Sequence, residues 1–455
     1  MALLEQQPDI KIHRDVPTVS LLPGILSKSP FRFLRDLVEE HGDLVRLKFG
    51  SNIFYVVSNP DYFQHILRDN QRNYVKSDAF YSSGRLIVGN GLITSDGDFW
   101  LRQRRMMQPH FHRQQITALS HVMMESIEQM LGGWLAPGQT EAPMDVRERM
   151  SEITINVTTR VIFGSNTLSQ EELHQANDDQ LFIIKYVALR GYTVFLPGWV
   201  PIPGTPRFNQ TMQRTRERVQ RIIDQVRAKG DQSNTLISML INTVDEETDE
   251  RMTDQQLMDE AMSLFIAGFE TTATLMTWLF YVLSLHPQVE ARLLEEIDTV
   301  VGSRRPTFDD LMQLPYCRKV IQETLRFYPP VGLLPRTSQV DDMLGEHPVP
   351  GKTLFLMFYY GLHHNGTYWE APETFDPERF SPVMHATQHR FAYMPFSTGP
   401  RKCIGDEFAM IEATLMLVMI LQRYRVRVQP VENMTPVVTA TLIPNKPIRA
   451  TVTRR

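Results

Sequence analysis

A ten-residue segment near the C-terminus limits the possible structure and chemistry of this chain more than any other part of its sequence. Residues 396–405 read FSTGPRKCIG, so Cys403 follows an aromatic residue, a glycine-containing turn and an arginine. Backbone N–H donors and nearby positive charge favour the thiolate form of cysteine, which is the form that binds metals. Gly399 and Gly405 allow the chain to wrap closely around the sulfur, because glycine tolerates positive φ and tight backbone approach. The helix expected after Gly405 directs its N-terminal dipole at the same atom, and the segment therefore predicts a metal-binding thiolate.

The chain of 455 residues contains only two cysteines, Cys317 and Cys403. A disulfide between them would consume the cysteine that the loop requires, so we expect both to be reduced and the protein to be cytoplasmic. Cys317 is expected to be a small buried apolar residue at the start of a helix. A lone thiolate with an open opposite coordination site is typical of haem iron, where the sulfur favours cleavage of the O–O bond.

A second unusual segment lies inside an apolar helix expected over residues 254–284. Residues 267–272 read AGFETT, which places a glycine, a carboxylate and two hydroxyls in an apolar setting. An unpaired buried Glu270 would cost several kcal/mol, and Thr271 can donate to the carbonyl of Ala267 and loosen the helix. An acid beside an alcohol can deliver protons, whereas a satisfied polar pair in a kinked core helix is the alternative. On this segment alone both interpretations remain open, and the cysteine loop favours the first.

These segments resemble those of the haem-thiolate monooxygenases, the cytochrome P-450 family, in its soluble bacterial form. The loop matches the pattern F-x-x-G-x-R-x-C-x-G, and residues 267–272 resemble the family's oxygen-activation helix. The resemblance extends from about residue 23 to the C-terminus. It implies a haem b cofactor (iron protoporphyrin IX) whose iron is bound by Cys403, with Glu270 and Thr271 as the catalytic acid and alcohol.

The resemblance also implies which residues surround the cofactor. Trp100 and Arg104 match the family's W-x-x-x-R element, and Arg336 and Arg401 occupy the other two positions that meet the haem propionates. Guanidinium groups suit this role because they form forked hydrogen bonds with carboxylates. The expected cofactor-binding residues are Trp100, Arg104, Arg336, Phe396, Arg401 and Gly405.

A charged pair further along the chain has an expected structural role. Glu323 and Arg326 are three residues apart on one face of a helix that is otherwise apolar, so the pair is expected to be buried. Arg379, in the sequence PERF, offers a second arginine. These residues resemble the family's E-x-x-R helix and its P-E-R-F partner, which implies that they hold the core behind the cysteine loop.

The expected substrate pocket is almost wholly apolar. Helix geometry places part of it on the face that carries Thr271, and the resemblance implies that a loop before Trp100, the segment after the E-x-x-R helix and a C-terminal hairpin complete it. The expected lining residues are Phe80, Leu86, Val88, Leu264, Ala267, Gly268, Val331, Leu333 and Leu442. Such a lining favours a terpenoid, steroid or fatty acid. Arg85 or Lys76, close by, could anchor a substrate carboxylate, but we expect them to be solvated loop charges.

Composition and periodicity predict a mainly α protein with small peripheral β-sheets around a buried haem. Hydrophobic residues make up 42% of the chain and charged residues 22%, and a net charge of −5 argues against nucleic-acid binding. Residues 1–14 have no long apolar run, so no membrane-spanning segment is expected there. We expect an N-terminal extension over 1–22 and one domain over 23–455. Helices are expected over 254–284, 287–301, 319–327 and 404–423, and strands over 44–49, 53–58, 353–358, 424–428 and 448–453.

One segment interrupts the expected helical pattern. Residues 194–206 contain four prolines and cannot form a helix. An apolar lid over the pocket and a rigid hydrophobic connector are both compatible with this segment.

The leading functional hypothesis is a monooxygenase that hydroxylates or epoxidises a lipophilic molecule with O₂. Because no flavin or ferredoxin-like segment is evident, a separate ferredoxin or flavodoxin is the expected electron donor, steered by a basic patch of Arg104, Arg105, Arg390, Arg401 and Lys402. One alternative is a peroxide-driven peroxygenase, which the intact acid–alcohol pair disfavours. A haem gas sensor or electron carrier is a second alternative, disfavoured because neither a spare domain nor a second iron ligand is evident.

Overall fold

The computed structural model describes residues 16–21, 24, 30–49, 52–164, 169–192, 202–229 and 235–455. Most of the expected N-terminal extension and residues 194–201 of the proline-rich segment lie outside the described residues. The last two residues of that segment, 205 and 206, begin helix α9 (Thr205–Lys229), contrary to the expectation, because proline is tolerated in the first turn of a helix. Residues 18–20 of the expected extension form a strand of the largest sheet.

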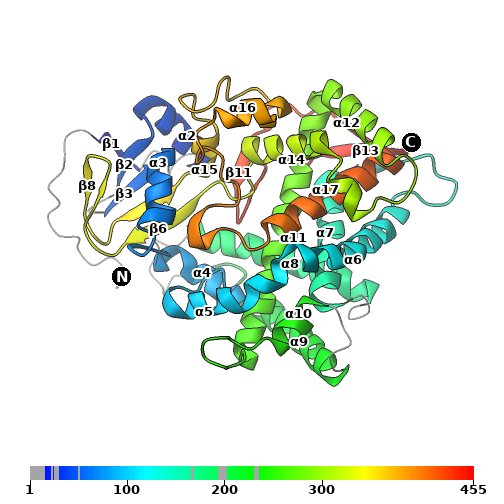
Figure 1. Ribbon diagram of the computed structural model, residues 1–455, viewed down its shortest axis with the longest axis horizontal. Coiled ribbons are helices and arrows are strands. Elements are labelled where there is room, and N and C mark those ends of the chain that lie inside the picture. Colours follow the sequence, from blue (N-terminus) through cyan, green and yellow to red (C-terminus); the bar gives the residue numbers. More distant parts are fainter. Residues whose placement is uncertain are drawn as a thin grey trace.

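Helices make up most of the described chain, and most of them lie on one side of the molecule, whereas α2, α3 and α15 lie with the main sheet on the other side (Figure 1). The α-helices are α2 (Pro30–His41), α3 (Pro60–Gln64), α4 (Asp78–Val88), α5 (Gly97–Met107), α6 (Arg113–Gly132), α7 (Val146–Phe163), α8 (Gln170–Tyr192), α9 (Thr205–Lys229), α10 (Leu236–Asn242), α11 (Asp254–Leu285), α12 (Pro287–Val300), α13 (Phe308–Leu311), α14 (Pro315–Phe327), α15 (Tyr359–His363), α16 (Pro382–Ala386) and α17 (Asp406–Arg423).

In the described residues, four sheets accompany the helices. The six-stranded sheet has the order β1-β2-β3-β9-β6-β4, in which β1 and β2 are parallel, as are β3 and β9, and the other neighbours are antiparallel. The remaining sheets are β10-β13-β5, β11-β12 and β7-β8. The strands are β1 (Thr18–Ser20), β2 (Leu44–Phe49), β3 (Asn52–Val57), β4 (Tyr74–Val75), β5 (Glu141–Asp145), β6 (Leu334–Ser338), β7 (Asp342–Leu344), β8 (His347–Val349), β9 (Leu354–Met357), β10 (Tyr424–Val428), β11 (Pro436–Val438), β12 (Leu442–Pro444) and β13 (Arg449–Arg454). The expectation of a mainly α fold with small sheets is confirmed.

Local sequence signals explain where the central helix and its neighbours begin. The Thr253 side chain accepts from the Gln256 N–H and the Gln256 side chain accepts from the Thr253 N–H, so a capping box starts α11. Pro287 occupies the first turn of α12, where its missing N–H costs nothing. Helix α14 begins at Pro315, four residues before the expected start, for the same reason.

Helix α11 is the core of the helical half. It packs against α7, α4, α14 and α17, and 78% of its most apolar window is buried inside the fold. Within the described residues it is the one helix long and apolar enough to cross a membrane, and its burial identifies it as a core helix. The Trp278 indole stacks on Tyr328 at 3.8 Å between ring centroids and donates to the Leu442 carbonyl at 2.7 Å, which joins α11 to the C-terminal hairpin.

Candidate functional site

The cysteine loop is closed by a backbone hydrogen bond. The Cys403 N–H donates to the Phe396 carbonyl at 2.9 Å, and the backbone takes positive φ at Ser397 (61°) and Gly399 (67°). A Cβ at residue 399 would lie 2.2 Å from the Leu67 carbonyl oxygen, so glycine is required there. Gly405 differs from the expectation, because its φ is −100° and a Cβ there would meet only a ring carbon at 4.0 Å. The protein itself therefore needs the special freedom of glycine at 399 and not at 405.

Cys403 is a free cysteine that is partly open to solvent. The side chain is exposed, although it lies between the loop and the start of α17. Enclosure of the sulfur by the surrounding chain raises the pKa of the Cys403 thiol, and the Asp406 charge raises it further, although part of the residue surface is open. The Gly405 N–H and the charges of Arg104 and Lys402 lower this pKa and so favour the thiolate. A cation bound to the sulfur would supply the missing stabilisation.

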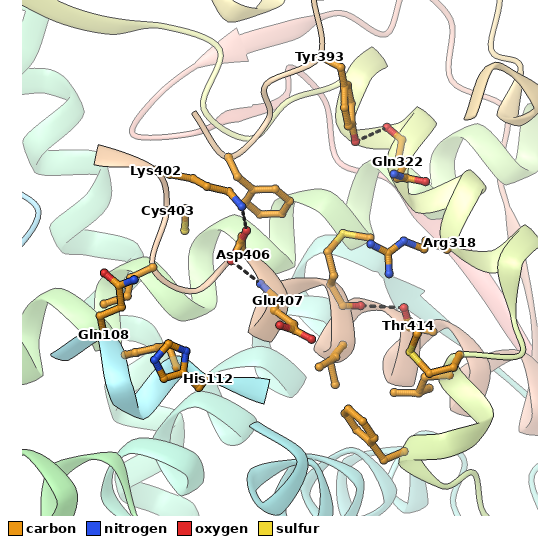
Figure 2. A pocket seen from close by; sticks show the side chains of 18 of the residues that line it. Gln108, His112, Arg318, Gln322, Tyr393, Lys402, Cys403, Asp406, Glu407 and Thr414 are labelled. Atoms are coloured by element: carbon orange, nitrogen blue, oxygen red, sulfur yellow. Dashed lines mark hydrogen bonds and ion pairs between the residues drawn. The ribbon is translucent and has the colours of Figure 1, made fainter. Parts of the chain in front are cut away.

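A cavity of about 580 Å³ lies beside the cysteine loop (Figure 2). Its walls come from the loop, the end of α5, α13, α14 and α17, and they include Cys403 itself. Lys402 pairs with Asp406 at its edge, and the Tyr393 hydroxyl donates to the Gln322 carbonyl at 3.0 Å. None of the nine expected substrate-pocket residues lines this cavity, so it is a separate feature with a mixed polar and apolar wall.

One face of α11 is open although the helix is otherwise buried. Ala267 is exposed and Leu264 and Thr271 are partly exposed, whereas Phe269 and Glu270 are buried. The Thr271 hydroxyl donates to the Ala267 carbonyl at 2.8 Å, as expected, but the helix continues without a break through this turn. An open face at this spacing can line a cavity.

Gly268 has a packing role that the sequence did not predict. A Cβ at this position would lie 2.9 Å from Thr158 Cγ2 on α7, which is closer than side chains normally approach. Glycine therefore allows α7 and α11 to come together behind the open face. The Cβ position of residue 268 therefore faces α7, whereas the sequence predicted that this residue lines the substrate pocket.

Glu270 is held on the buried side of α11 by two distant residues. It is 3% exposed and its Oε1 accepts from the Thr441 hydroxyl at 2.9 Å and from Arg147 Nη2 at 3.3 Å. Burial raises the pKa of Glu270, and the Arg147 charge and the Thr441 hydrogen bond oppose that rise. Glu270 and Thr271 are thus adjacent in sequence but engaged with different partners. Sequence reasoning missed Arg147 and Thr441.

The expected propionate-binding residues connect α5, β6 and the cysteine loop. The Arg401 guanidinium lies 3.6 Å from the Trp100 ring centroid, donates to the Ser95 carbonyl at 3.2 Å and pairs with Asp96. Arg104 Nη1 donates to the Lys402 carbonyl at 2.9 Å. The structure therefore brings Trp100, Arg104 and Arg401 together around the loop.

Arg336 extends the same cationic cluster from β6. It is 5% exposed, and its Nη1 donates to the Pro335 carbonyl at 2.8 Å and to the Tyr81 hydroxyl at 3.3 Å. Within the described part of the chain, no carboxylate forms an ion pair with Arg336. A nearly buried guanidinium with neutral partners favours the binding of an anion.

The expected structural pair forms a buried hub. Arg326 Nε and Nη2 donate to the two Glu323 oxygens at 2.7 and 2.8 Å, and both side chains are fully buried. Arg326 Nη1 also donates to the carbonyls of His363 and Pro372, at 2.8 and 2.9 Å. Arg379 Nε lies 3.5 Å from Glu323 Oε1, so all three expected residues meet. Burial raises the pKa of Glu323, against the effect of both arginines.

The expected substrate-pocket residues divide between two apolar clusters. Phe80, Leu333 and Leu442 share the cluster beside the six-stranded sheet, and Val88 and Leu264 belong to the main helical core. Ala267 stands on the open face of α11, and Val331 is partly buried. Leu86 is 38% exposed, and its carbonyl accepts from Arg216 at 3.2 Å.

The expected basic patch is largely neutralised. Arg105 pairs with Asp245 and Glu247, each at 2.7 Å, and Lys402 and Arg401 also pair with carboxylates. Three of the five expected cations therefore have acidic partners, and the surface is less positive than expected.

Sequence reasoning also missed a buried acid on α17. Glu412 is fully buried. Burial raises the pKa of Glu412 to about 8, although the nearby Thr272 hydroxyl favours the charged form. A lone glutamate inside the apolar run 408–421 is the signal that identifies it.

Comparison with known proteins identifies relatives along nearly the whole chain. The sequence model of the family described as Cytochrome P450 matches residues 13–452. Cyclooctatin synthase of Streptomyces melanosporofaciens is 35% identical over 90% of this chain and 89% of that protein. Pentalenene oxygenase of Streptomyces avermitilis is 33% identical over 94% of each chain. The crystal structure of the cytochrome P450DA heme domain shares the fold, with a TM-score of 0.87 at 24% identity over 97% of this chain and 98% of that chain.

Proposed function

The chain belongs to the cytochrome P450 family and is a monooxygenase, and on this premise we propose that it oxidises a terpenoid. Relatives named cyclooctat-9-en-7-ol 5-monooxygenase and pentalenene oxygenase support this substrate class. The apolar residues near the open face of α11 support it as well, because a lipophilic ligand needs few polar contacts. We also propose one haem domain, which the match over residues 13–452 supports.

The residues present fit a haem bound through Cys403. The sulfur has an open surface, Ala267 is exposed in the middle of a core helix, and Arg336 is nearly buried without an anionic partner in the described chain. When bound, the haem would supply an iron that activates O₂ for transfer of one oxygen atom to the substrate. Arg336 and Arg401 would hold its carboxylates, with Trp100 and Arg104 beside them.

Thr271 and Glu270 are the proposed proton-handling residues. The Thr271 hydroxyl donates to the Ala267 carbonyl, which leaves its oxygen lone pairs free to accept a hydrogen bond on the open face. The raised pKa of Glu270 favours its protonated form, which can act as a proton donor. Arg147 is 28% exposed at its side chain and contacts Glu270, so it connects this acid to the solvent side. Oε1 accepts both hydrogen bonds, so the proton of the neutral acid is on Oε2, and a change of the Glu270 rotamer would carry it toward Thr271.

Electrons are proposed to come from a separate ferredoxin or flavodoxin in the cytoplasm. The bacterial relatives support this compartment. The cavity beside the cysteine loop is lined by both positive and negative side chains, which are Arg104, Arg318, Lys402, Asp406 and Glu407. A partner that docks there would therefore need a mixed charge pattern, and a strongly acidic surface alone would not match it.

The open Cys403 thiol inside a closed loop is the observation that carries the proposal. The reduced, carbon monoxide-bound protein should absorb at the long-wavelength position typical of thiolate ligation. Cys403→Ser should lose this band, and Cys317→Ala, which changes the other cysteine, should keep it. A wild-type band at the position typical of a neutral ligand would contradict the proposal.

The substrate class is tested with the same ferric protein. Terpenes should shift the spin state of the haem at lower concentrations than steroids or fatty acids of similar size. A stronger response to fatty acids would contradict the terpenoid assignment while leaving the monooxygenase assignment intact.

A further inference from the structure

The side chain of Thr441 connects the C-terminal hairpin to the central helix. Thr441 lies in the turn between β11 and β12 and is 4% exposed. Its hydroxyl lies 2.9 Å from Glu270 Oε1 and 3.1 Å from the hydroxyl of Thr274, which is one turn further along α11. A residue of the hairpin turn therefore contacts the acid of the central helix directly.

The number of available protons sets the direction of these two hydrogen bonds. Thr441 has a single O–H, and this O–H donates to Glu270 Oε1. In the contact between the two threonine hydroxyls, the donor must then be Thr274. Thr274 thereby aligns the Thr441 hydroxyl and keeps its proton directed at Glu270.

The hydrogen bonds of the Glu270 carboxyl within the described residues both end at Oε1. Besides Thr441, Arg147 Nη2 donates to this oxygen, at 3.3 Å. A proton on Oε1 would face the Arg147 N–H and would reverse the hydrogen bond from Thr441, so the neutral acid carries its proton on Oε2. Oε1 is thus a fixed point, and Oε2 can move with its proton.

The hairpin turn that carries Thr441 is itself held in place by hydrogen bonds. The Trp278 indole donates to the Leu442 carbonyl at 2.7 Å, and the Thr439 N–H donates to the Thr441 carbonyl at 2.8 Å. Because Trp278 lies on α11, the helix that carries the acid also fixes the turn. The Thr441 hydroxyl therefore has little freedom to move away from the carboxyl group.

We propose that Thr441 is a positioning residue for proton transfer from Glu270, because it holds Oε1 while Oε2 and its proton move. The proposal rests on the proposed role of Glu270, and Thr441 acts through that acid. Without the Thr441 hydroxyl, only the longer contact with Arg147 would hold Oε1, and the proton would be shared between both oxygens. Proton transfer would then start from the productive arrangement less often.

The infrared spectrum of the ferric protein tests this arrangement without turnover. At mildly acidic pH, where burial favours the neutral acid, the C=O stretch of Glu270 is the carboxyl band that Glu270→Gln removes. Thr441→Val should move this band to higher frequency, because a hydrogen bond to the carbonyl oxygen polarises and weakens the C=O bond. Thr441→Ser keeps the hydroxyl and should leave the band in place.

A second threonine of the same turn provides the matched control for the infrared experiment. The Thr439 hydroxyl donates to the Thr441 carbonyl at 3.1 Å and not to Glu270, so Thr439→Val should not move the band. An unshifted band in Thr441→Val would overturn the proposal. The absence of any carboxyl band that Glu270→Gln removes would also overturn it, since the acid would then be ionised.

Turnover separates positioning of the acid from a loss of packing. With the terpene that gives the strongest spin-state response, Thr441→Val should form product about fivefold more slowly than wild type, at an unchanged KM, as expected for the loss of one hydrogen bond. Thr441→Ser should restore the wild-type rate, and Thr439→Val should keep it. In a Glu270→Gln background, Thr441→Val should cause no further loss, because no proton remains to be positioned.

The double variant also decides between the proposal and its premise. A further loss of turnover in the double variant would show that Thr441 acts on the packing of α11, and it would overturn the proposal. Wild-type turnover in Thr441→Val would do the same. Failure of the proposed role of Glu270 would appear separately, as wild-type turnover in Glu270→Gln alone.

Discussion

Individual residues in this protein acquire their chemical properties from partners that are remote in sequence. Glu270 pairs with Arg147, 123 positions away, and with Thr441, 171 positions away. Its raised pKa follows from burial and not from Thr271, its neighbour in the motif. The function of the pair therefore depends on how tightly Glu270 is held by these contacts.

Replacement of Glu270 by glutamine should slow product formation about a hundredfold, because the amide still accepts from Thr441 but cannot release a proton. The carbon monoxide spectrum and the substrate-induced spin shift should remain, since neither requires a proton from residue 270. Steady-state turnover with the reductase, with Glu290→Gln on α12 as control, measures the effect. Unchanged turnover in Glu270→Gln would remove Glu270 from the mechanism.

Glu412 should make stability depend on pH. Its folded-state pKa of about 8 lies above the ordinary value of 4.5, so the folded protein binds the proton more tightly than the unfolded chain. The contribution of Glu412 to stability is therefore fully present below pH 4.5 and falls as the pH rises toward 8. Between pH 6 and 8 the loss should be about 2 kcal/mol, from about 1.4 kcal/mol per pH unit while only the folded state is protonated.

Glu412→Gln should flatten this dependence, because glutamine remains neutral. Thermal unfolding followed by circular dichroism at pH 6, 7 and 8 compares the variant with wild type. Glu295→Gln, an exposed glutamate on α12, should keep the wild-type slope. Parallel curves for wild type and Glu412→Gln would show that Glu412 is not protonated in the folded protein.

At the level of elements, hydrophobic periodicity predicted the positions of helices and strands, because local sequence largely determines them. The expected helix over 254–284 is α11 (254–285), and the expected strand over 44–49 is β2. Backbone geometry was predicted less well, because Gly399 and Gly405 look equivalent in the motif and only Gly399 has positive φ. Only residue 399 also lacks space for a side chain, because tertiary packing brings the Leu67 carbonyl next to it.

Gly399→Ala should therefore damage the cysteine loop. A positive φ costs a non-glycine residue about 1–2 kcal/mol, and the clash with the Leu67 carbonyl adds to it. We expect a lower thermal midpoint and partial loss of the thiolate band. Gly132→Ala, at the end of α6 with no atom within 4 Å of the added Cβ, should change neither. A stable Gly399→Ala protein with a full band would show that the loop tolerates another backbone path.

At the scale of the whole molecule, the residues of the proposed site come from both the helical half and the sheet half of the fold. Arg336 reaches it from the six-stranded sheet, Glu270 from the central helix and Cys403 from the loop between them. The motifs provide a predicted set of site residues and say little about the neighbours that folding brings to them. They did not predict the surroundings of Lys76, because a lysine in a polar stretch of sequence carries no sign that folding will place it near arginines.

The Glu323–Arg326 hub should control assembly of the whole molecule. Arg326 on α14 holds carbonyls of residues 363, 372 and 374 as well as Glu323, so it fixes the segment that leads toward the cysteine loop. Lysine cannot replace this planar fork, and Arg326→Lys would leave a buried carboxylate half satisfied. We expect a loss of about 3–5 kcal/mol in stability and little haem-containing protein.

A matched exposed pair provides the control for the hub. Arg292 pairs with Glu378 at 2.7 Å, but its side chain is 53% exposed, so Arg292→Lys should change stability by less than about 1 kcal/mol. Haem content per mole of purified protein, together with the urea midpoint, compares the two variants. Because Glu323 and Arg326 touch neither Thr271 nor Cys403 in the described structure, any haem-loaded Arg326→Lys protein should turn over substrate at the wild-type rate. A fully stable Arg326→Lys variant, or a loaded one with slow turnover, would contradict a purely structural role for the hub.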